Sequence, residues 1–232
     1  MGKLGKIFAG TALLALILTG CNVFSFGKAS EESIEIEKDD AKELDVELKL
    51  GAGELNLSGG ANQWLEGRIE DSKEPKVSYK LNGDKGKLTV AQKSKQGINF
   101  KDNEWDLQLT KDVPLSLKIS TGAAETDLNL SGIQLTDLDI ETGVGELNLD
   151  VSGDWKESFD INLETGVGQV TVILPSNVGV KVTSSKGIGS AEFKDLISQG
   201  NGVYVNEAYE NSDIIITVNA EMGVGEVIFK VE

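Results

Sequence analysis

Carboxylates are the only abundant functional groups in this chain, so any chemistry has to be argued from them first. The 232 residues include 38 Asp and Glu, 22 Lys and Arg, one cysteine and no histidine. Without histidine there is no Ser-His or Cys-His nucleophile pair, and most zinc sites lose their usual ligand. The options that remain are paired carboxylates acting as acid and base, cation binding, or a solvated surface.

One set of carboxylates recurs at a fixed place, directly after a repeated G-x-G triplet. Alternation of side chains along a strand should turn this position outward. We expect Glu125 and Glu146 to be neighbours in a ladder, with Asp127 beside them. Gln169 and Ser190 would end the charged run. The whole row reads Glu54, Glu125, Glu146, Gln169, Ser190 and Glu226.

Three interpretations of this ladder remain open: a solvated outer face, a surface that binds divalent cations or glycans, and a glycosidase or lyase with paired carboxylates. Such an enzyme needs carboxyls about 5–10 Å apart in a cleft. A flat ladder gives that spacing without enclosure, and three carboxylates fall short of the six to eight oxygens that calcium takes. The G-x-G triplets lie between strands and lack the helix N-terminus of a phosphate loop. We therefore predict no catalytic residue, no metal site and no cofactor.

The single cysteine follows a short apolar segment. Two lysines precede an apolar run over residues 7–18, which is shorter than the about 20 residues needed to span a bilayer. The run has the length of a signal peptide and ends in Leu18-Thr19-Gly20-Cys21, which resembles the lipobox of bacterial lipoproteins. The resemblance implies acylation of Cys21 by fatty acids such as palmitate, and a lipid anchor on the extracytoplasmic face of the cell membrane.

The net charge argues against one class of partner. The formal charge is −16 for the whole chain, and it becomes −18 when Lys3 and Lys6 leave with the signal peptide. A surface this acidic repels nucleic acid and anionic lipid headgroups. We predict that the membrane is contacted through lipid on Cys21 and that there is no nucleic acid partner.

The dominant feature of the sequence is an internal repeat of alternating strand, G-x-G bend and alternating strand. From Gly122 the first glycines of successive copies are 21, 23, 21 and 36 residues apart. Apolar residues occupy the odd positions before each bend, as in Leu115, Leu117 and Ile119. Since one copy cannot bury its apolar face alone, neighbouring copies must stack. The pattern predicts an all-β, two-sheet β-solenoid, with an antiparallel sandwich of hairpins as the alternative.

The bends carry two further expectations. Glycine permits positive φ or close approach of two backbones, so a β-branched residue in place of Gly145 should destabilise the fold. The residues between the two glycines are aliphatic in four copies, and we expect them to plug the end of the core: Val144, Val167, Ile188 and Val224.

Residues 60–113 interrupt the repeat. Four segments read as strands, at 64–70, 77–81, 88–92 and 105–109, with a turn at residues 82–86. We expect an antiparallel cap on the first coil, because solenoids need their apolar ends covered. Residues 196–212 should form an excursion between the last two coils. The predicted organisation is a signal peptide at 1–20, a lipidated tether at 21–32, the first repeat with the antiparallel unit at 33–113, and solenoid repeats at 114–232.

A succession of motifs is similar to a known family. In order along residues 44–232 stand Trp64-Leu65-Glu66-Gly67, Pro75-Lys76-Val77, Trp105-Asp106-Leu107-Gln108-Leu109, Val113-Pro114-Leu115-Ser116-Leu117, Gly122-Ala123-Ala124-Glu125 and Gly143-Val144-Gly145-Glu146. This order resembles the toast-rack domain family and the related putative-adhesin β-repeat family of bacterial envelope lipoproteins. The resemblance implies a stacked β architecture in the envelope and, for some relatives, attachment to envelope-stress-sensing membrane proteins. It supplies no catalytic residues, and the chain departs from the pattern at Ala124 and Ser190.

The sequence as a whole predicts a lipid-anchored, extracytoplasmic β-repeat scaffold. We expect it to act without catalysis, as a binding or adhesion module or as an accessory to an envelope-stress system. Its partner would be an envelope protein or a cell-wall glycan. The alternative is a carbohydrate-active β-helix enzyme that uses the surface carboxylates.

Overall fold

The computed structural model describes residues 32–70, 75–93 and 103–232, and confirms the all-β prediction. Six long strands form the body: β2 (Glu43–Gly59), β7 (Leu115–Asn129), β8 (Leu135–Asp150), β9 (Phe159–Leu174), β10 (Gly179–Lys194) and β13 (Ile215–Val231). The shorter elements are β1 (Glu32–Ile36), β3 (Leu65–Glu70), β4 (Lys76–Asn82), β5 (Lys85–Ala91), β6 (Glu104–Leu109), β11 (Ile197–Gly200), β12 (Val203–Val205) and the 3-10 turn η1 (Tyr209–Asn211).

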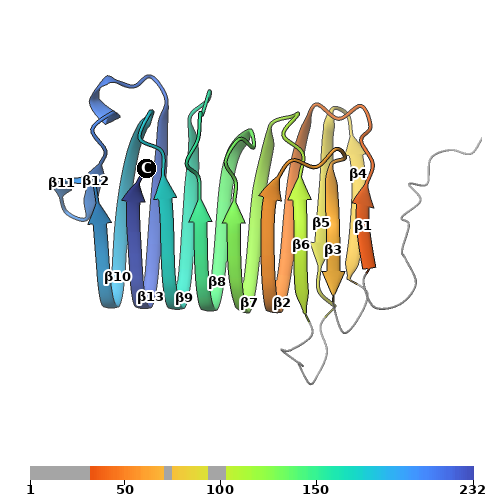
Figure 1. Cartoon of the computed structure of the whole chain (residues 1–232), viewed down its shortest axis with the longest axis horizontal. Helices are drawn as coiled ribbons and strands as arrows, with labels where there is room; N and C mark the ends of the chain where they lie inside the picture. Colours follow the sequence, from red (N-terminus) through yellow and green to blue (C-terminus); the bar gives the residue numbers. More distant parts are fainter. Residues whose placement is uncertain (1–31, 71–74, 94–102) are drawn as a thin grey trace, which may run out of the picture.

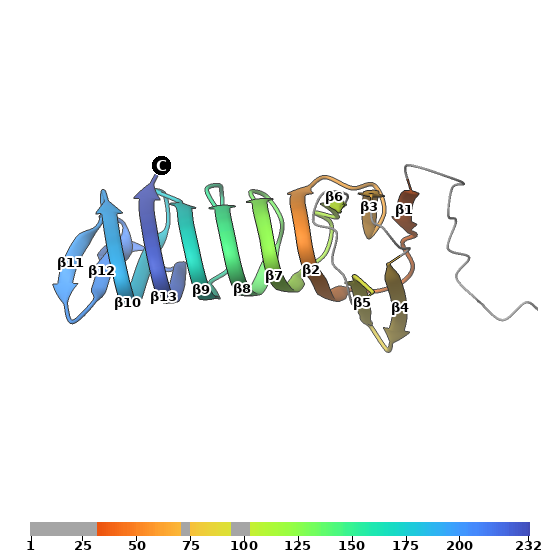
Figure 2. The same cartoon turned by 90° about the horizontal axis from the view of Figure 1, so that it is seen from below.

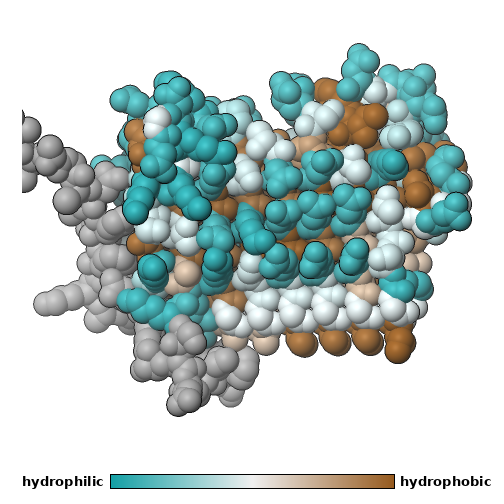
Figure 3. Space-filling model, turned by 180° about the vertical axis from the view of Figure 1, so that it is seen from behind, coloured by the Kyte–Doolittle hydropathy of each residue, from teal (hydrophilic) through white to brown (hydrophobic). Residues whose placement is uncertain are grey.

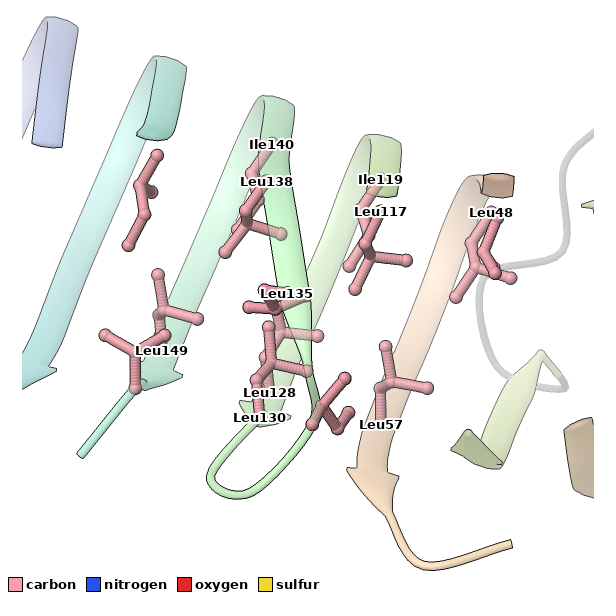
Figure 4. Close-up of a cluster of buried hydrophobic side chains, with 14 of the residues drawn as sticks. Leu48, Leu57, Leu117, Ile119, Leu128, Leu130, Leu135, Leu138, Ile140 and Leu149 are labelled. Atoms are coloured by element: carbon pink, nitrogen blue, oxygen red, sulfur yellow. The ribbon is translucent and has the colours of Figure 1, made fainter. Parts of the chain in front are cut away.

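Each long strand folds at its bend into a first arm before the bend and a second arm after it (Figure 1). In β7 the first arm buries Leu115, Leu117 and Ile119, and the second arm buries Leu128. Figure 4 shows such side chains between the two arms, next to their counterparts in adjacent coils. This burial has the period of two expected of a strand. The two arms therefore form the two facing layers of a stacked solenoid, as predicted.

The spatial order of the coils departs from the order of the sequence. The sheet runs β1-β3-β6-β2-β7-β8-β9-β13-β10-β12-β11, so β13 lies between β9 and β10 (Figure 1). Both interfaces of β13 are parallel, and they align Val224 with Val167 on one side and with Ile188 on the other. The excursion expected between the last two coils instead lies beyond the stack. Its strands β11 and β12 pair antiparallel at the outer edge of β10.

An aromatic stack covers the β10 end of the core. Tyr204 of β12 stacks on Phe193 of β10, with ring centroids 3.5 Å apart and an interplanar angle of 7°. Phe193 in turn stacks on Phe229 of β13 at 5.4 Å and 11°. Because Phe229 is fully buried, this stack ties the terminal hairpin to the interior of the solenoid.

The N-terminal unit continues both layers past β2. β5 pairs in parallel with the first arm of β2, and β6 pairs in parallel with its second arm, so that together they occupy the place of one more coil. Beyond them β4 pairs antiparallel with β5, while β3 and β1 extend the β6 side antiparallel (Figure 2). The four strands predicted here are present. Their contact with the first coil is parallel, however, and only the outer strands are antiparallel as expected.

Backbone passes close to backbone at the bends. Gly145 has a φ of +146°, and a Cβ built on it would lie 1.8 Å from the carbonyl oxygen of Ala124 in the adjacent coil. A Cβ built on Gly168 or on Gly225 would likewise lie 1.8 Å from a glycine carbonyl oxygen of the adjacent coil. Only glycine accommodates both the conformation and the approach. In β7 the corresponding residue is Ala124, which is not at positive φ, so this departure from the pattern coincides with a different bend conformation.

The aliphatic residue between the two glycines points outward, so the prediction that it plugs the core is wrong. The exposed fractions are 55% for Val144, 46% for Val167, 43% for Val224 and 75% for Ile188. Ile140 and Leu147 both face the core although they are seven positions apart. Strict alternation would put them on opposite faces, so the inward register shifts by one residue at the bend. Val144 falls within this shift and lies on the outer apex.

The core is closed instead at the opposite end, by loops that join one coil to the next. Leu130 and Ile133 are buried in the loop after β7, and Trp155 is buried in the loop after β8. The Trp155 indole Nε1 donates to the carbonyl of Val151 at 2.8 Å, and its ring lies 4.5 Å from that of Phe159. These side chains close the end of the core, which is the role that was expected for the aliphatic residues at the bends.

Thr126→Val is expected to stabilise the fold. Thr126 lies at an inward position between Leu55 and Leu147 of the adjacent coils, and its fully buried hydroxyl has no hydrogen-bond partner among the described residues. Because burying an unpaired hydroxyl is costly and valine has nearly the same shape, we expect urea unfolding to show a gain of about 1 kcal/mol. Thr165→Val is the control, since the Thr165 hydroxyl is 3.1 Å from that of Thr142. A gain of equal size in both variants would contradict the explanation.

Candidate binding face on the second arms

The outer face of the second arms carries an unbroken row of carboxylates, which we call the acidic row. Strand register aligns its members from β3 across β6, β2 and β7 to β8: Glu70, Glu104, Glu54, Glu125 and Glu146. Adjacent strands are about 4.8 Å apart, so each carboxylate has a like charge next to it. Glu125 and Glu146 are exposed neighbours, as predicted.

The charged run ends differently from the prediction. Gln169 of β9 closes it, but the next residue in space is Glu226, because β13 lies between β9 and β10. Ser190 follows Glu226, and its hydroxyl donates to that carboxylate at 3.3 Å. The other end of the row could not be predicted from the repeat, because Glu70 and Glu104 come from the N-terminal unit, which lacks it.

A second row, one step further from the bends, mixes charge with amides. This mixed row consists, in spatial order, of Arg68, Asp106, Asn56, Asp127, Asn148 and Thr171. Arg68 Nη2 donates to Asp106 at 2.8 Å, and Asn148 Nδ2 donates to Asp127 at 2.9 Å and to Glu146 at 3.1 Å. Asp127, the third residue of the predicted ladder, is therefore half-buried and hydrogen-bonded. The alternation of carboxylate and amide avoids like charges on directly opposite residues.

The mixed row lines an open groove of ≈ 850 Å³ that runs across the second arms from β3 to β9. Beside the mixed row, the lining includes Gln108, Asn129 and Asp150 from the next row. The groove thus presents amides, carboxylates and one guanidinium group on an open sheet face. Such a surface can hydrogen-bond an extended polar ligand or a partner protein.

Crowding of like charges perturbs one member of the acidic row. The pKa of Glu104 is raised above its ordinary value, mainly by the neighbouring charge of Asp106, then by desolvation and by the charges of Glu54 and Glu70. Arg68, whose Nη2 lies 3.9 Å from Glu104, opposes the shift. The ionised form of Glu104 is therefore unfavourable next to Asp106 and the flanking carboxylates at this end of the stack.

Glu104→Gln is expected to stabilise the protein at neutral pH. Since the folded-state pKa is raised, the penalty is present above that pKa and disappears as the pH falls through it. Chemical unfolding at pH 7 should show a gain that fades toward acidic pH and in about 1 M salt. Glu226→Gln is the control, because its row neighbours are Gln169 and Ser190. A gain for Glu104→Gln that ignored pH and salt would point to a cause other than charge.

A further acidic surface covers the outer face of the first arms. It includes Asp137, whose pKa is raised by desolvation and by the charges of Asp139 and Asp160. Part of this surface is paired: Lys118 Nζ lies 2.6 Å from Glu141 and lowers the pKa of that carboxyl. Among the described residues no group of three or more His, Cys, Asp or Glu side chains is arranged to hold a metal ion.

The predicted lipidation site lies outside the described residues, since these begin at residue 32 and the cysteine is Cys21. Within the described ranges, no helix has both the length and the apolar character needed to cross a membrane. The anchor therefore stays a prediction from the sequence.

Two family models and several solved structures match this chain. A family model described as the N-terminal domain of toast_rack matches residues 25–173, and one described as "Cell wall-active antibiotics response LiaF, C-terminal" matches residues 124–228. The structure of a putative cell adhesion protein from Clostridium sporogenes is similar, with a TM-score of 0.80 and 31% identity over 88% of this chain and 100% of that one. A putative adhesin from Bacteroides fragilis aligns over 87% of this chain and 98% of its own, at 12% identity and a TM-score of 0.30. A search of curated proteins found no match. The chain belongs to the toast-rack family.

Proposed function

We propose that the protein is a lipid-anchored, extracytoplasmic binding scaffold that serves an envelope-stress response without catalysis. The observation that carries this proposal is the LiaF-like match, which covers residues 124–228 and thus most of the regular stack. The name of that family refers to a response to cell wall-active antibiotics. The stack supplies what such a module needs, namely a continuous apolar core with polar rows displayed at fixed spacing.

The route of the chain fits a short anchor. Register through β3 and β6 aligns Glu32, the first residue of β1, with Leu55, the second residue after the bend of β2. The chain therefore enters the fold at the edge formed by the bends. Ten residues lie between Cys21 and Glu32, and the eleven residue-to-residue steps can reach roughly 40 Å when extended. An acyl anchor at Cys21 would hold the bend edge close to the membrane.

The groove along the mixed row offers the partner surface under this proposal. Its lining of Arg68, Asp127, Asn148 and neighbouring polar groups suits an envelope protein or a cell-wall glycan. The carboxylates of the acidic row stand on an open face, where a substrate would not be enclosed between acid and base. A scaffold therefore accounts for this geometry better than a carbohydrate-active enzyme.

Cys21→Ser is expected to release the protein from the membrane, because Cys21 is the only cysteine and ends the lipobox-like motif. Two acyl chains give stable anchoring, and their removal leaves an acidic domain that anionic headgroups repel. Cell fractionation followed by high-salt and carbonate washing measures this. Retention of the variant in washed membranes would refute the lipid anchor.

Site-directed photo-crosslinking in intact cells tests the scaffold function. A photoreactive residue in place of Asn129, in the groove, should capture an envelope protein or glycan. The same residue in place of Leu81 on β4, exposed and far from the groove lining, is the control. Deletion of the gene should also change the output of an envelope-stress reporter. Equal capture at both positions together with an unchanged reporter would overturn the proposal.

A further inference from the structure

The bend edge carries an exposed apolar row that the fold itself does not use. This aliphatic ridge consists of Val144, Val167, Val224 and Ile188, aligned in that order across β8, β9, β13 and β10. All four side chains are between 43% and 75% exposed, and Figure 3 shows them as a hydrophobic line along the lower edge. Four strands at about 4.8 Å spacing make the ridge about 14 Å long.

Glycines flank every ridge residue, and because glycine has no side chain, the ridge side chains protrude above the surface on both sides. On the first-arm side this forms an open trough of ≈ 600 Å³, which is lined by Gly143, Gly166 and Gly223 and by the threonines Thr142 and Thr165. A partner can thus contact each ridge side chain from two sides. A contiguous apolar row of this kind on a surface is typical of an interaction site.

Carboxylates border the ridge on both sides. Glu164 and Glu221 are exposed neighbours on the first arms, and Glu146 and Glu226 lie on the second arms. Glu141 adds to the first-arm side, although it is paired with Lys118. At the β10 end lies a second cation, Lys186, whose Nζ donates to the carbonyl of Gly189 at 2.8 Å. The surroundings of the apolar row are therefore strongly acidic.

The charge pattern selects among the possible occupants. A second copy of the chain would set carboxylate rows against carboxylate rows, and an anionic membrane surface would likewise be repelled. An amphipathic helix with an apolar stripe and lysines or arginines on both sides matches apolar to apolar and cation to anion. Its turns repeat every 5.4 Å, close to the strand spacing of about 4.8 Å, so successive apolar residues can meet successive ridge positions.

We propose that the aliphatic ridge is a docking site for an amphipathic α-helix whose apolar stripe is flanked by basic residues. About ten residues of helix cover the ridge at 1.5 Å per residue. The bend edge is also where the chain enters from Cys21, so a membrane-proximal helix of an envelope protein is the source in reach. Only the assignment of the helix to an envelope protein rests on the proposed function. The contact itself depends on the ridge and its carboxylates alone.

The contact can be tested with a synthetic helix. The probe is a fluorescent peptide of about 14 residues with leucines at i, i+3, i+4 and i+7 and lysines on either side. The protein is the chain from residue 22 onward, which retains every described strand. Anisotropy should show binding and circular dichroism a gain in helix. A scrambled peptide of the same composition and a peptide with glutamates in place of lysines should both fail to bind.

Variants assign the binding to the ridge. Val144→Ser with Val167→Ser should weaken binding at least about tenfold, the loss expected when buried valine side chains are removed from a contact. Val144→Thr with Val167→Thr keeps the β-branched shape that suits a strand, and it should also weaken peptide binding. This second variant separates a loss of the contact from a loss of folding in the serine variant. Glu146→Gln with Glu221→Gln should weaken binding about threefold and reduce its salt dependence. Leu81→Ser, at an exposed apolar residue elsewhere, should change nothing.

Several results would overturn the proposal. These are equal binding of the scrambled or glutamate peptide, or unchanged affinity in the valine variants. Valine-dependent binding of anionic vesicles would assign the ridge to the membrane surface instead, and a dimer in sedimentation that the valine variants abolish would assign it to a second copy. Failure of the Cys21→Ser test would remove the anchored scaffold but leave the peptide result standing.

Discussion

Gly145→Ala is expected to lower the free energy of unfolding by about 3–5 kcal/mol, the sum of a strained positive φ and an added atom without space. At the φ of +146° observed here, a Cβ would lie 1.8 Å from the carbonyl oxygen of Ala124 and 2.8 Å from its carbonyl carbon. These atoms belong to the backbone of the adjacent coil, so relief requires that two coils move apart along their shared register. Valine at the same position should cost more, because its two methyl groups add to the clash.

Gly60→Ala is the matched control for this prediction. Gly60 also has a positive φ, +127°, but nothing lies within 4 Å of the Cβ that would be added. The control therefore carries the conformational cost, about 1–3 kcal/mol, without the clash. Urea unfolding of both variants isolates the contribution of coil-to-coil approach. Equal losses would mean that the close packing of backbones at the bends contributes nothing measurable.

Phe229→Ala is expected to cost about 3–5 kcal/mol, as large-to-small changes of buried aromatic residues do. Phe229 is fully buried on the second arm of β13 and stacks on Phe193, which stacks on Tyr204 of the terminal hairpin. Its removal leaves a cavity, and it also removes the ring on which Phe193 and Tyr204 stack at the β10 end. The loss should therefore appear both in global stability and in faster amide exchange of β12.

Ile228→Ala, one residue earlier on the same strand, provides the control. Ile228 points to the opposite side and is only partly buried, so its truncation should cost far less than that of Phe229. Hydrogen exchange read at Val203–Val205 distinguishes local uncovering from uniform destabilisation. Protection of β12 that is unchanged in Phe229→Ala would contradict the supporting role of the stack.

The layered architecture could be predicted because the alternation of apolar and polar residues identifies the inward face of each strand. Leu115, Leu117 and Ile119 alternate with polar residues, and a period of two allows only one choice of buried face. Glycine at the bend was informative for a similar reason, because an added Cβ at a position such as Gly145 would clash with the backbone of the adjacent coil. Local sequence patterns were therefore sufficient to predict the coil, its bend and the strands of the N-terminal unit.

The order of the coils could not be predicted, because the copies present the same pattern to both neighbours. Any two G-x-G strands can align in parallel, as Val224 does with Val167 and with Ile188. The longer step of 36 residues before the last copy signalled an excursion, but not that the chain crosses back over β10. The carboxylate row differed from the predicted one at two places. Glu104 enters it through the pairing of β6 with β2, which has no repeat signature, and Glu226 lies next to Gln169 because β13 precedes β10 in the sheet.

The position of β13 also determines when the fold can be completed as the chain emerges, N-terminal end first. Coils β7, β8 and β9 can be added in the order of the sequence, each on the edge of the one before. β10 emerges next, but its partner in the sheet is β13, which follows it by about twenty residues. Until β13 arrives, the growing sheet ends at an unpaired edge of β9. The last quarter of the chain thus has to assemble in one concerted step, and this interval is when the unfinished protein is most exposed to mispairing with other chains.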